Sequence, residues 1–248
     1  NSGRSPYPHL HFQVQEHPYV GSVTKAFPVS YYVLTREDSF ELRTFDIPEA
    51  GELLSNIERN ELLYNAFHLI PGRMMSFDVV RNGEKYRTSW KVDTDPYNNT
   101  LINCQDTGAI AYFINDGQLF YFTHYSGNKK SLLYYFFMAA FQVQQGFYQD
   151  LELKDRYPLN LIYRQPLLGL QDIVAPIWKF LRSEYSIRYE WIDSEFSPSE
   201  IRLSSSARNS MAGRTTGSWD FSLVINQQGL SRIIVNSGKL SMEARCTE

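Results

Sequence analysis

Cysteine is scarce in this chain, which contains two, Cys104 and Cys246, among 248 residues. Two cysteines are too few for the disulfide framework that stabilises small secreted domains. They allow one bridge at most, so the cysteine content excludes neither an oxidising nor a reducing compartment.

Long apolar runs are also missing. The longest, LLYYFFMAAF at residues 132–141, is about half of the roughly 20 residues that a transmembrane helix needs. Lys129 and Lys130 precede it and glutamines follow it, so we predict a buried helix and no transmembrane segment in this chain. Residue 1 is Asn, and the first fifteen residues are polar and lack the apolar core of a signal peptide. Export therefore stays an open question.

Basic residues are not concentrated in any stripe. The chain has 24 Lys and Arg against 27 Asp and Glu, a formal net charge of -3, and the basic residues are scattered singly. Since nucleic-acid-binding proteins gather Lys and Arg on one face, we expect no nucleic acid as a partner. None of these features indicates an oligomeric state.

Aromatic residues are abundant: they make up 15% of the chain, with 17 Tyr and 16 Phe. A hydrophobic content of 43% is enough for a packed core, and aromatic side chains suit the faces of β-sheets. Core packing is therefore the first interpretation. The alternative is a groove for glycan or peptide, with the candidates Tyr86, Trp90, Tyr112, Phe113, Phe120, Tyr121 and Tyr125.

Alternation of apolar and polar residues predicts strands over much of the chain. The clearest pattern is two hairpins, residues 74–80 with 85–93 around Arg81-Asn82-Gly83, and residues 109–114 with 118–125 around Asn115-Asp116-Gly117. Asn-Gly is a favoured pair in a type I′ turn. Further strands are predicted at residues 7–15, 26–34, 39–47, 186–193, 200–207, 219–226, 230–238 and 239–245.

Three stretches have the apolar spacing of helices. They are residues 50–70, ending at Pro71-Gly72; residues 129 to about 145, with Ser126 or Asn128 as the cap; and residues 167–185, interrupted at Pro176. Strands and helices occur in blocks instead of strict alternation. The sequence therefore predicts an α+β fold, mostly antiparallel β-sheet with two or three helices.

The sequence begins with NSGRSPYPHLHFQVQ, in which His9 and His11 lie one residue apart. Since residues 7–15 alternate as a strand, both imidazoles are expected on the same face. Such a pair can bind zinc through one histidine while the other acts on the metal-bound water. Taken alone, His-x-His is a weak pattern, because two histidines on a solvent-facing strand are its commoner explanation.

The residues around the pair form a more specific pattern. Gly3-Arg4-Ser5 followed by PHLHF at residues 8–12 resembles the terminal motif of the M23 (lysostaphin-like) zinc endopeptidases, which cut peptide cross-links in peptidoglycan. The resemblance covers residues 3 to about 34, less than a seventh of the chain. It implies that residues 1–36 are the terminal strands of a truncated peptidase domain and that residues 37–248 form an α+β C-terminal domain of unknown function.

The resemblance also implies roles for the two histidines. In this family one zinc is bound by a His and an Asp of an earlier His-x-x-x-Asp segment and by the second His of the pair. His11 would then be the zinc ligand, and His9 the catalytic residue that orients or deprotonates the attacking water. No His-x-x-x-Asp occurs here: the fourth residue after each of the five histidines is Gln, Gly or Asn. With one of three ligands present, we expect this chain neither to bind Zn2+ tightly nor to hydrolyse peptidoglycan.

Two functions follow from the resemblance. The first is an accessory or binding region of a bacterial peptidoglycan-cleaving zinc metallopeptidase, catalytically incomplete in this chain, located in the cell envelope and with peptidoglycan or cell-wall peptide as its partner. The alternative is an interaction or regulatory tail of a larger membrane protein, such as a Bacteroidetes-type urea transporter fused to a similar peptidase domain.

Two serine motifs match the nucleophile motif of penicillin-interacting enzymes. They are Ser22-x-x-Lys25 and Ser126-x-x-Lys129, and no Lys-Thr-Gly strand accompanies either. Ser126 is interpreted as a helix cap instead.

Carboxylates also form two candidate groups. Asp93-x-Asp95 resembles the start of a calcium loop, but Pro96 and Tyr97 break the ligand pattern, so a turn is predicted. The second group contains Asp150, Glu152 and Asp155. It is interpreted as a solvated loop face, and paired carboxylates for acid–base chemistry are the less favoured alternative.

Overall fold

The computed structural model describes residues 13–36, 39–43, 45–148, 151–192, 199–238 and 240–247. The chain divides into two compact units, Asn1–Asn56 and Ile57–Glu248, each with its own sheets. This division lies further along the chain than the boundary between residues 36 and 37 that the peptidase resemblance implies. The boundary between residues 36 and 37 separates the part that resembles the peptidase from the rest of the chain, and it stays a prediction.

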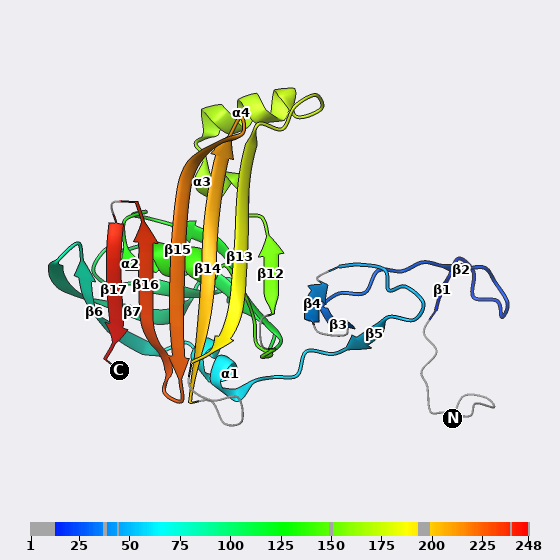
Figure 1. The fold of residues 1–248 in the computed structure, drawn as a ribbon, viewed down its shortest axis with the longest axis horizontal. Coiled ribbons are helices and arrows are strands. Elements are labelled where there is room, and N and C mark those ends of the chain that lie inside the picture. Colours follow the sequence, from blue (N-terminus) through cyan, green and yellow to red (C-terminus); the bar gives the residue numbers. More distant parts are fainter. Residues whose placement is uncertain are drawn as a thin grey trace. The chain divides into compact units, whose positions relative to one another are not determined.

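The first unit contains two small sheets (Figure 1). β1 (Val14–Gln15) pairs with β2 (Thr24–Lys25), and β3 (Tyr32–Arg36) lies between β4 (Ser39–Arg43) and β5 (Leu53–Ser55). The first three residues of β3 are buried. Of the strand predicted at residues 7–15, residues 7–12 lie outside the described residues, and β1 is its described part. The strand predicted at residues 26–34 begins only at Tyr32.

The second unit is built on one antiparallel sheet, in which the described residues form 12 strands. Their order across the sheet is β11-β10-β9-β8-β7-β6-β17-β16-β15-β14-β13-β12. Their bounds are β6 (Met74–Arg81), β7 (Glu84–Thr94), β8 (Thr100–Cys104), β9 (Ile110–Asn115), β10 (Leu119–Ser126), β11 (Gln142–Gln144), β12 (Glu152–Asp155), β13 (Leu181–Trp191), β14 (Glu200–Met211), β15 (Arg214–Asn226), β16 (Gly229–Ser237) and β17 (Leu240–Cys246).

The chain passes through this sheet from its middle to one edge and then returns from the other edge. It leaves β6 and runs through successive neighbours to β11, crosses to β12 at the opposite edge, and comes back to β17. β17 pairs with β6, so that Met242 lies opposite Arg81 and Cys246 opposite Phe77 (Figure 1). The two halves of the sheet are therefore joined by its first and last strands.

Both predicted hairpins are confirmed. β6 and β7 pair directly, and Asn82 and Gly83 between them have φ angles of 48° and 91°, the left-handed conformation that a type I′ turn requires. β9 and β10 pair across the Asn115-Asp116-Gly117 turn. The predicted fold class, α+β with mostly antiparallel sheet, is also confirmed.

A short helix at residues 159–162 was not predicted, and the other helices are each shorter than the stretch predicted for them. The described residues contain four helices in all, against the two or three predicted. They are α1 (Glu61–Phe67), α2 (Leu132–Ala139), α3 (Leu159–Ile162) and α4 (Gln165–Val174). No helix in this described part of the chain is both long and apolar enough to cross a membrane.

Caps and strand pairing explain the short helices. Asn60 caps α1, because its side chain accepts hydrogen bonds from the N–H groups of Leu62 and Leu63, and residues 53–55 pair with β3 instead of extending the helix. Ser131 caps α2, and residues 142–144 pair with β10. The third predicted helix ends at the close of α4, and its last five residues belong to β13.

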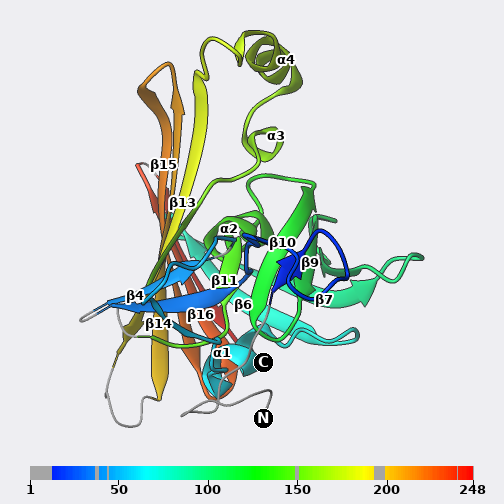
Figure 2. The same cartoon turned by 90° about the vertical axis from the view of Figure 1, so that its right-hand side faces the viewer.

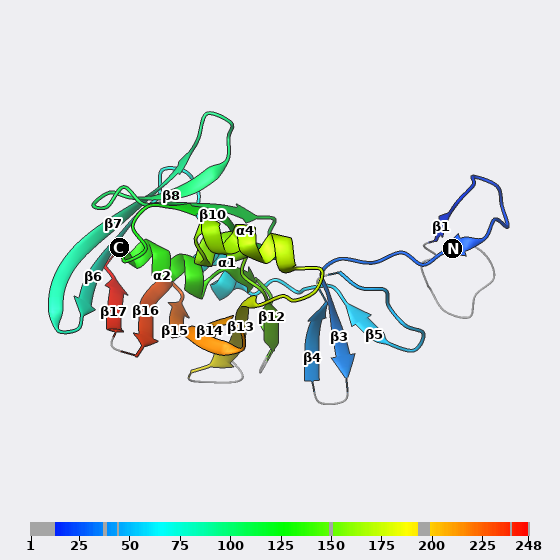
Figure 3. The ribbon, with the colours of Figure 1, turned by 90° about the horizontal axis from the view of Figure 1, so that it is seen from above.

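The core of the second unit forms around α2, in which every residue except Tyr134 is buried. Figure 3 shows α2 between the half of the sheet that contains β7, β8 and β10 and the half that contains β13 to β16. The ring of Phe136 lies 5.2 Å from that of Trp90 and 5.6 Å from that of Phe122. The prediction that LLYYFFMAAF is a buried helix is thus correct for residues 132–139.

β11 lies at an edge of the sheet but is buried, so its backbone needs partners other than a second strand. The N–H of Gln145 donates to the C=O of Gln118 at 2.8 Å. Since antiparallel hydrogen bonds alternate along a strand, Gln144 turns its own N–H and C=O away from β10. The hydroxyl of Tyr189 meets both groups: it accepts from Gln144 N at 2.7 Å and donates to Gln144 O at 3.1 Å.

Other hydroxyls satisfy the last carbonyl groups of α2. Tyr157 donates to the C=O of Met138 at 2.6 Å, and Ser205 donates to the C=O of Ala139 at 2.7 Å. The hydroxyl of Tyr185 lies 3.2 Å from Ala139 O and 3.1 Å from Gln142 O. Through Tyr185 and Ser205, β13 and β14 hold the segment from α2 to β11. In the chain this segment comes directly after β10, which belongs to the other half of the sheet.

We expect Tyr189→Phe to lower the free energy of unfolding by at least about 2 kcal/mol, because each buried backbone group left without a partner costs about 1–3 kcal/mol. Urea denaturation followed by circular dichroism measures this loss. Tyr97→Phe is the matched control, since Tyr97 is 86% exposed and its hydroxyl should contribute little. A Tyr189→Phe protein as stable as this control would contradict the role assigned to the Tyr189 hydroxyl.

Alkaline pH tests the same hydroxyls in another way. Burial raises the pKa of Tyr185 and of Tyr189 above the ordinary value of 10.0, so the folded protein keeps protons that the unfolded chain loses. The stability that this contributes is complete below the unfolded pKa and is lost as the pH rises above it. We expect the free energy of unfolding to fall above about pH 10, with a shallower slope in Tyr189→Phe. Identical slopes in the two proteins would argue against this linkage.

Candidate functional site

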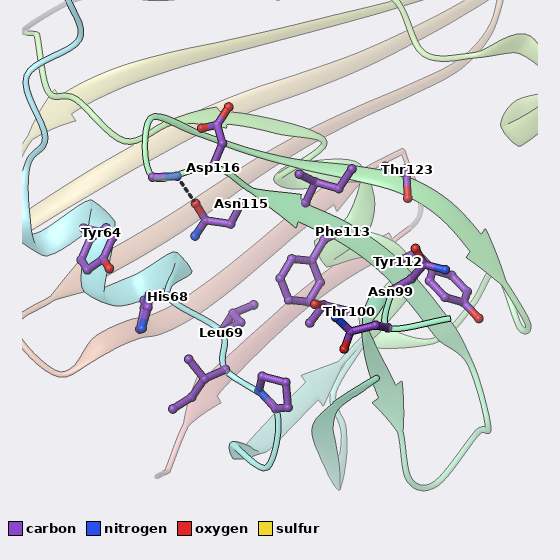
Figure 4. Close-up of a pocket in the computed structure, with 15 residues that line it drawn as sticks. Tyr64, His68, Leu69, Asn99, Thr100, Tyr112, Phe113, Asn115, Asp116 and Thr123 are labelled. Carbon is purple, nitrogen blue, oxygen red and sulfur yellow. Dashed lines mark hydrogen bonds between the residues drawn. The ribbon is translucent and has the colours of Figure 1, made fainter. Parts of the chain in front are cut away.

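A hollow of about 730 Å³ opens on the surface of the second unit (Figure 4). The end of α1 and the residues after it form one side, the turn between β7 and β8 forms another, and β9 with its turn into β10 supplies the rest. The polar and aromatic lining residues include Tyr64, His68, Asn98, Tyr112, Asn115 and Asp116. The volume lies within the range of small-ligand sites in proteins.

Asn115 fixes the part of the hollow where β9 meets α1. Its Nδ2 donates to the C=O of Phe67 at 3.0 Å, and its Oδ1 accepts from the N–H of Gly117 at 2.9 Å and from Nε2 of Gln145. One side chain therefore links the end of α1, the β9–β10 turn and the residue after β11. These bonds are all made within the protein, so this wall of the hollow is held by the fold itself.

Aromatic rings border the hollow on two sides (Figure 4). Tyr64 and His68 lie four residues apart at the end of α1, and their rings stack with centroids 4.9 Å apart. The guanidinium of Arg59 lies 4.3 Å from the centre of the Tyr64 ring, a cation–π contact that holds the tyrosine in position. Across the hollow, Tyr112 lies 6.3 Å from His124, ring centre to ring centre.

Asp95 organises the turn that carries Asn98 and Asn99. Its carboxylate accepts hydrogen bonds from the side-chain amide and backbone N–H of Asn99, at 2.9 and 2.8 Å, and from the N–H of Tyr97 at 2.9 Å. The hydrogen bond from the Asn99 side chain is the main reason that the pKa of Asp95 is lowered. The turn predicted at Asp93-x-Asp95 begins only at Asp95, because Asp93 lies on β7 and pairs with Leu101 of β8.

The lining of the hollow suits binding more than catalysis. Its carboxylate, Asp116, accepts from the N–H groups of Gln118 and Leu119 at 2.9 and 2.7 Å, so one oxygen is used to hold the turn. His68 is exposed and stacks on Tyr64. The other polar lining groups are mostly amides and hydroxyls, which donate and accept hydrogen bonds. Aromatic faces beside such groups recognise ligands with both apolar faces and polar edges.

The residues predicted to bind zinc cannot be compared with this hollow. His9, the predicted catalytic residue, and His11, the predicted zinc ligand, lie outside the described residues, as does Gly3-Arg4-Ser5. Within the described ranges, no three His, Cys, Asp or Glu side chains gather in a group that could hold a metal ion.

The prediction that Ser126 or Asn128 caps the second helix is wrong. Ser126 ends β10, and Gly127 follows with a φ of 120°, which turns the chain before the helix cap, Ser131. The neighbouring Lys129 is held by a backbone contact, because its Nζ donates to the C=O of Leu161 at 2.7 Å. Burial lowers the pKa of Lys129.

The aromatic residues proposed for a groove divide between core and surface. Trp90, Phe113, Phe120 and Tyr125 are buried, whereas Tyr86, Tyr112 and Tyr121 are partly or largely exposed. Tyr112 and Phe113 are the members of this set that line the hollow. Sequence reasoning missed Tyr64 and His68, although their spacing of four residues within a predicted helix already placed them on one face.

The remaining candidates have structural explanations. Cys104 is buried, Cys246 is partly buried, and the two form no disulfide. Glu152 and Asp155 lie on β12, not on the loop that was predicted, and Glu152 pairs with Lys154 at 3.0 Å. Asp150 lies outside the described residues.

Comparison of the chain with protein-family models, with curated proteins and with solved structures finds no match. The hollow therefore has to be interpreted from its own side chains.

We expect protein purified without a histidine tag to contain far less than stoichiometric zinc, because one histidine without further ligands holds the metal weakly. Elemental analysis of the full chain, of His11→Ala and of the control His17→Ala should give the same low value. Stoichiometric zinc that is lost in His11→Ala and retained in His17→Ala would contradict this expectation and show that His11 finds its remaining ligands elsewhere.

Proposed function

We propose that this chain is a non-catalytic binding region that positions a bacterial peptidoglycan-cleaving zinc metallopeptidase of the M23 type on its substrate. In this proposal the catalytic zinc site belongs to the larger protein. The chain contributes the hollow between α1, the β7–β8 turn and β9, which takes peptidoglycan or cell-wall peptide. The cell envelope is the compartment in which such a region acts.

The lining of the hollow is the observation that supports this proposal. Tyr64 and Tyr112 present aromatic rings from two sides, and the lining also contains the side-chain amides of Asn98 and Asn115. A glycan strand with attached peptides offers apolar ring faces together with hydroxyl and amide groups. Such a ligand can stack on Tyr112, contact the edges of the Arg59–Tyr64–His68 stack, and exchange hydrogen bonds with the amides.

Rigidity of the hollow strengthens the case for binding. The Asn115 network, the Arg59–Tyr64–His68 stack and the Asp95 turn each fix one side through contacts within the protein. A site that is ordered in advance loses less conformational entropy when it binds. The open form of the hollow fits a short stretch of a polymer that continues beyond it.

The test is co-sedimentation of the full chain with purified peptidoglycan sacculi. We expect the double variant Tyr64→Ala/Tyr112→Ala to bind about tenfold more weakly or worse, because each aromatic contact is worth about 0.5–1.5 kcal/mol. Tyr97→Ala is the matched control, since this tyrosine is 86% exposed and does not line the hollow. Circular dichroism should show that all three proteins keep the same secondary structure.

Two outcomes would contradict the proposal. If the sacculi retain the double variant as well as they retain Tyr97→Ala, the hollow is not the binding site. If they do not retain the full chain at all, the region does not bind peptidoglycan, and the alternative of an interaction tail of a larger membrane protein becomes the better explanation.

A further inference from the structure

The second unit has a protruding end that is separate from the hollow. Strands β13, β14 and β15 extend beyond the rest of the sheet, and α3 and α4 lie at that end (Figures 1 and 2). We use the name α4 tip for α4, the residues 175–180 after it and the β14–β15 turn. The N–H of Ala212 in that turn donates to the C=O of Phe180 at 2.7 Å, so these segments are in contact.

The α4 tip is held firmly on its inner side. The side chain of Gln171 is buried, and its Oε1 accepts from the N–H groups of Phe180 and Leu181 at 3.0 and 2.9 Å. Just before α4, the hydroxyl of Tyr163 lies 3.0 Å from Arg182 O and 2.8 Å from Ser210 O. These bonds fix which face of α4 is turned outward.

The outward face of the α4 tip is apolar. Leu170 is 51% exposed, Ile173 79%, Ile177 94% and Trp178 57%. Leu170 and Ile173 are three residues apart on α4, which places them on neighbouring positions of one helix face, and Ile177 and Trp178 follow the end of the helix. Burying large side chains of this kind is worth about 1.5–3 kcal/mol each, so four of them left in water between residues 170 and 178 indicate a surface that is covered in use.

The net charge around this face is positive, whereas the net charge of the whole protein is negative. Exposed basic residues of the α4 tip and its borders are Arg164, Lys179, Arg182 and Arg214, and the exposed acidic residue among them is Asp172. The complete chain has a formal net charge of -3. An apolar face with a cationic border is complementary to an anionic lipid surface, which combines an apolar interior with phosphate groups.

We propose that the α4 tip docks on the surface of an anionic membrane. Ile173 and Ile177 enter the boundary of the acyl chains, Trp178 lies at the level of the headgroups, and the basic residues contact lipid phosphates. The contact is in the plane of the surface and does not span the bilayer. A second copy of this chain is a poorer occupant, because a two-fold contact between identical tips brings their cationic borders together.

The experiment is co-sedimentation of the full chain with vesicles of phosphatidylcholine alone and of phosphatidylcholine mixed with phosphatidylglycerol. We expect the unchanged chain to bind the mixed vesicles. The double variant Ile173→Ser/Ile177→Ser should bind them at least tenfold more weakly. Changing Arg164, Lys179 or Arg214 to Gln should weaken binding about fivefold for each residue changed. The control is Val20→Ser/Val23→Ser, which removes two apolar side chains that are 105% and 79% exposed in the first unit. This control should bind as the unchanged chain does.

Fluorescence quenching by brominated lipid shows which part of the chain touches the membrane. We expect quenching of tryptophan fluorescence in mixed vesicles and its loss in Trp178→Phe, although Trp90, Trp191 and Trp219 remain. Failure of the full chain to bind mixed vesicles would overturn the proposal, as would binding that both serine double variants retain equally. Self-association in sedimentation velocity that is lost in Ile173→Ser/Ile177→Ser, without vesicle binding, would overturn it in favour of a second copy. None of these results depends on whether the hollow binds peptidoglycan.

Discussion

The hydroxyl groups of β13 are the contacts on which the rest of the second unit depends. The chain enters the core through α2 and leaves it through β11, so backbone groups at the end of the helix and along the strand are removed from water. A buried peptide group without a partner costs about as much as a lost hydrogen bond or more. Tyr185 and Tyr189 lie on the same face of β13 and supply the missing partners, which fixes the two halves of the sheet around the helix.

The same segment also organises the hollow. Gln144 is held by Tyr189, and the next residue, Gln145, accepts from the N–H of Asn60 at 2.8 Å through its C=O and donates from Nε2 to Asn115. Asn60 is the residue that caps α1 and thereby sets where Tyr64 and His68 lie. The position of the aromatic side of the hollow is therefore linked to the tyrosine contacts in the core through three consecutive hydrogen-bonded steps.

The two surfaces for which we propose ligands differ in chemistry and are formed by different elements. The hollow combines tyrosine rings with amides on α1, β9 and the β7–β8 turn, which suits a polar polymer with apolar faces. The α4 tip combines aliphatic side chains with basic residues, which suits a lipid surface. A region that binds the cell wall at one place and a membrane at another would hold an attached peptidase between the two. Each contact can be removed by substitutions that leave the other unchanged.

Local patterns in the sequence determined the hairpins and the fold class. Asn82-Gly83 adopts the left-handed backbone that a two-residue turn demands, and alternation of apolar residues identified most of the long strands. The lengths of the helices, the short strand β11 and the division of the aromatic residues between core and surface were decided by tertiary structure. The hollow joins Tyr64, Asn98 and Tyr112, which are far apart in the chain and which no sequence spacing relates. Pairing of β6 with β17 and the contacts of Tyr189 bring such segments together, because buried polar groups find their partners across the fold and not along the chain.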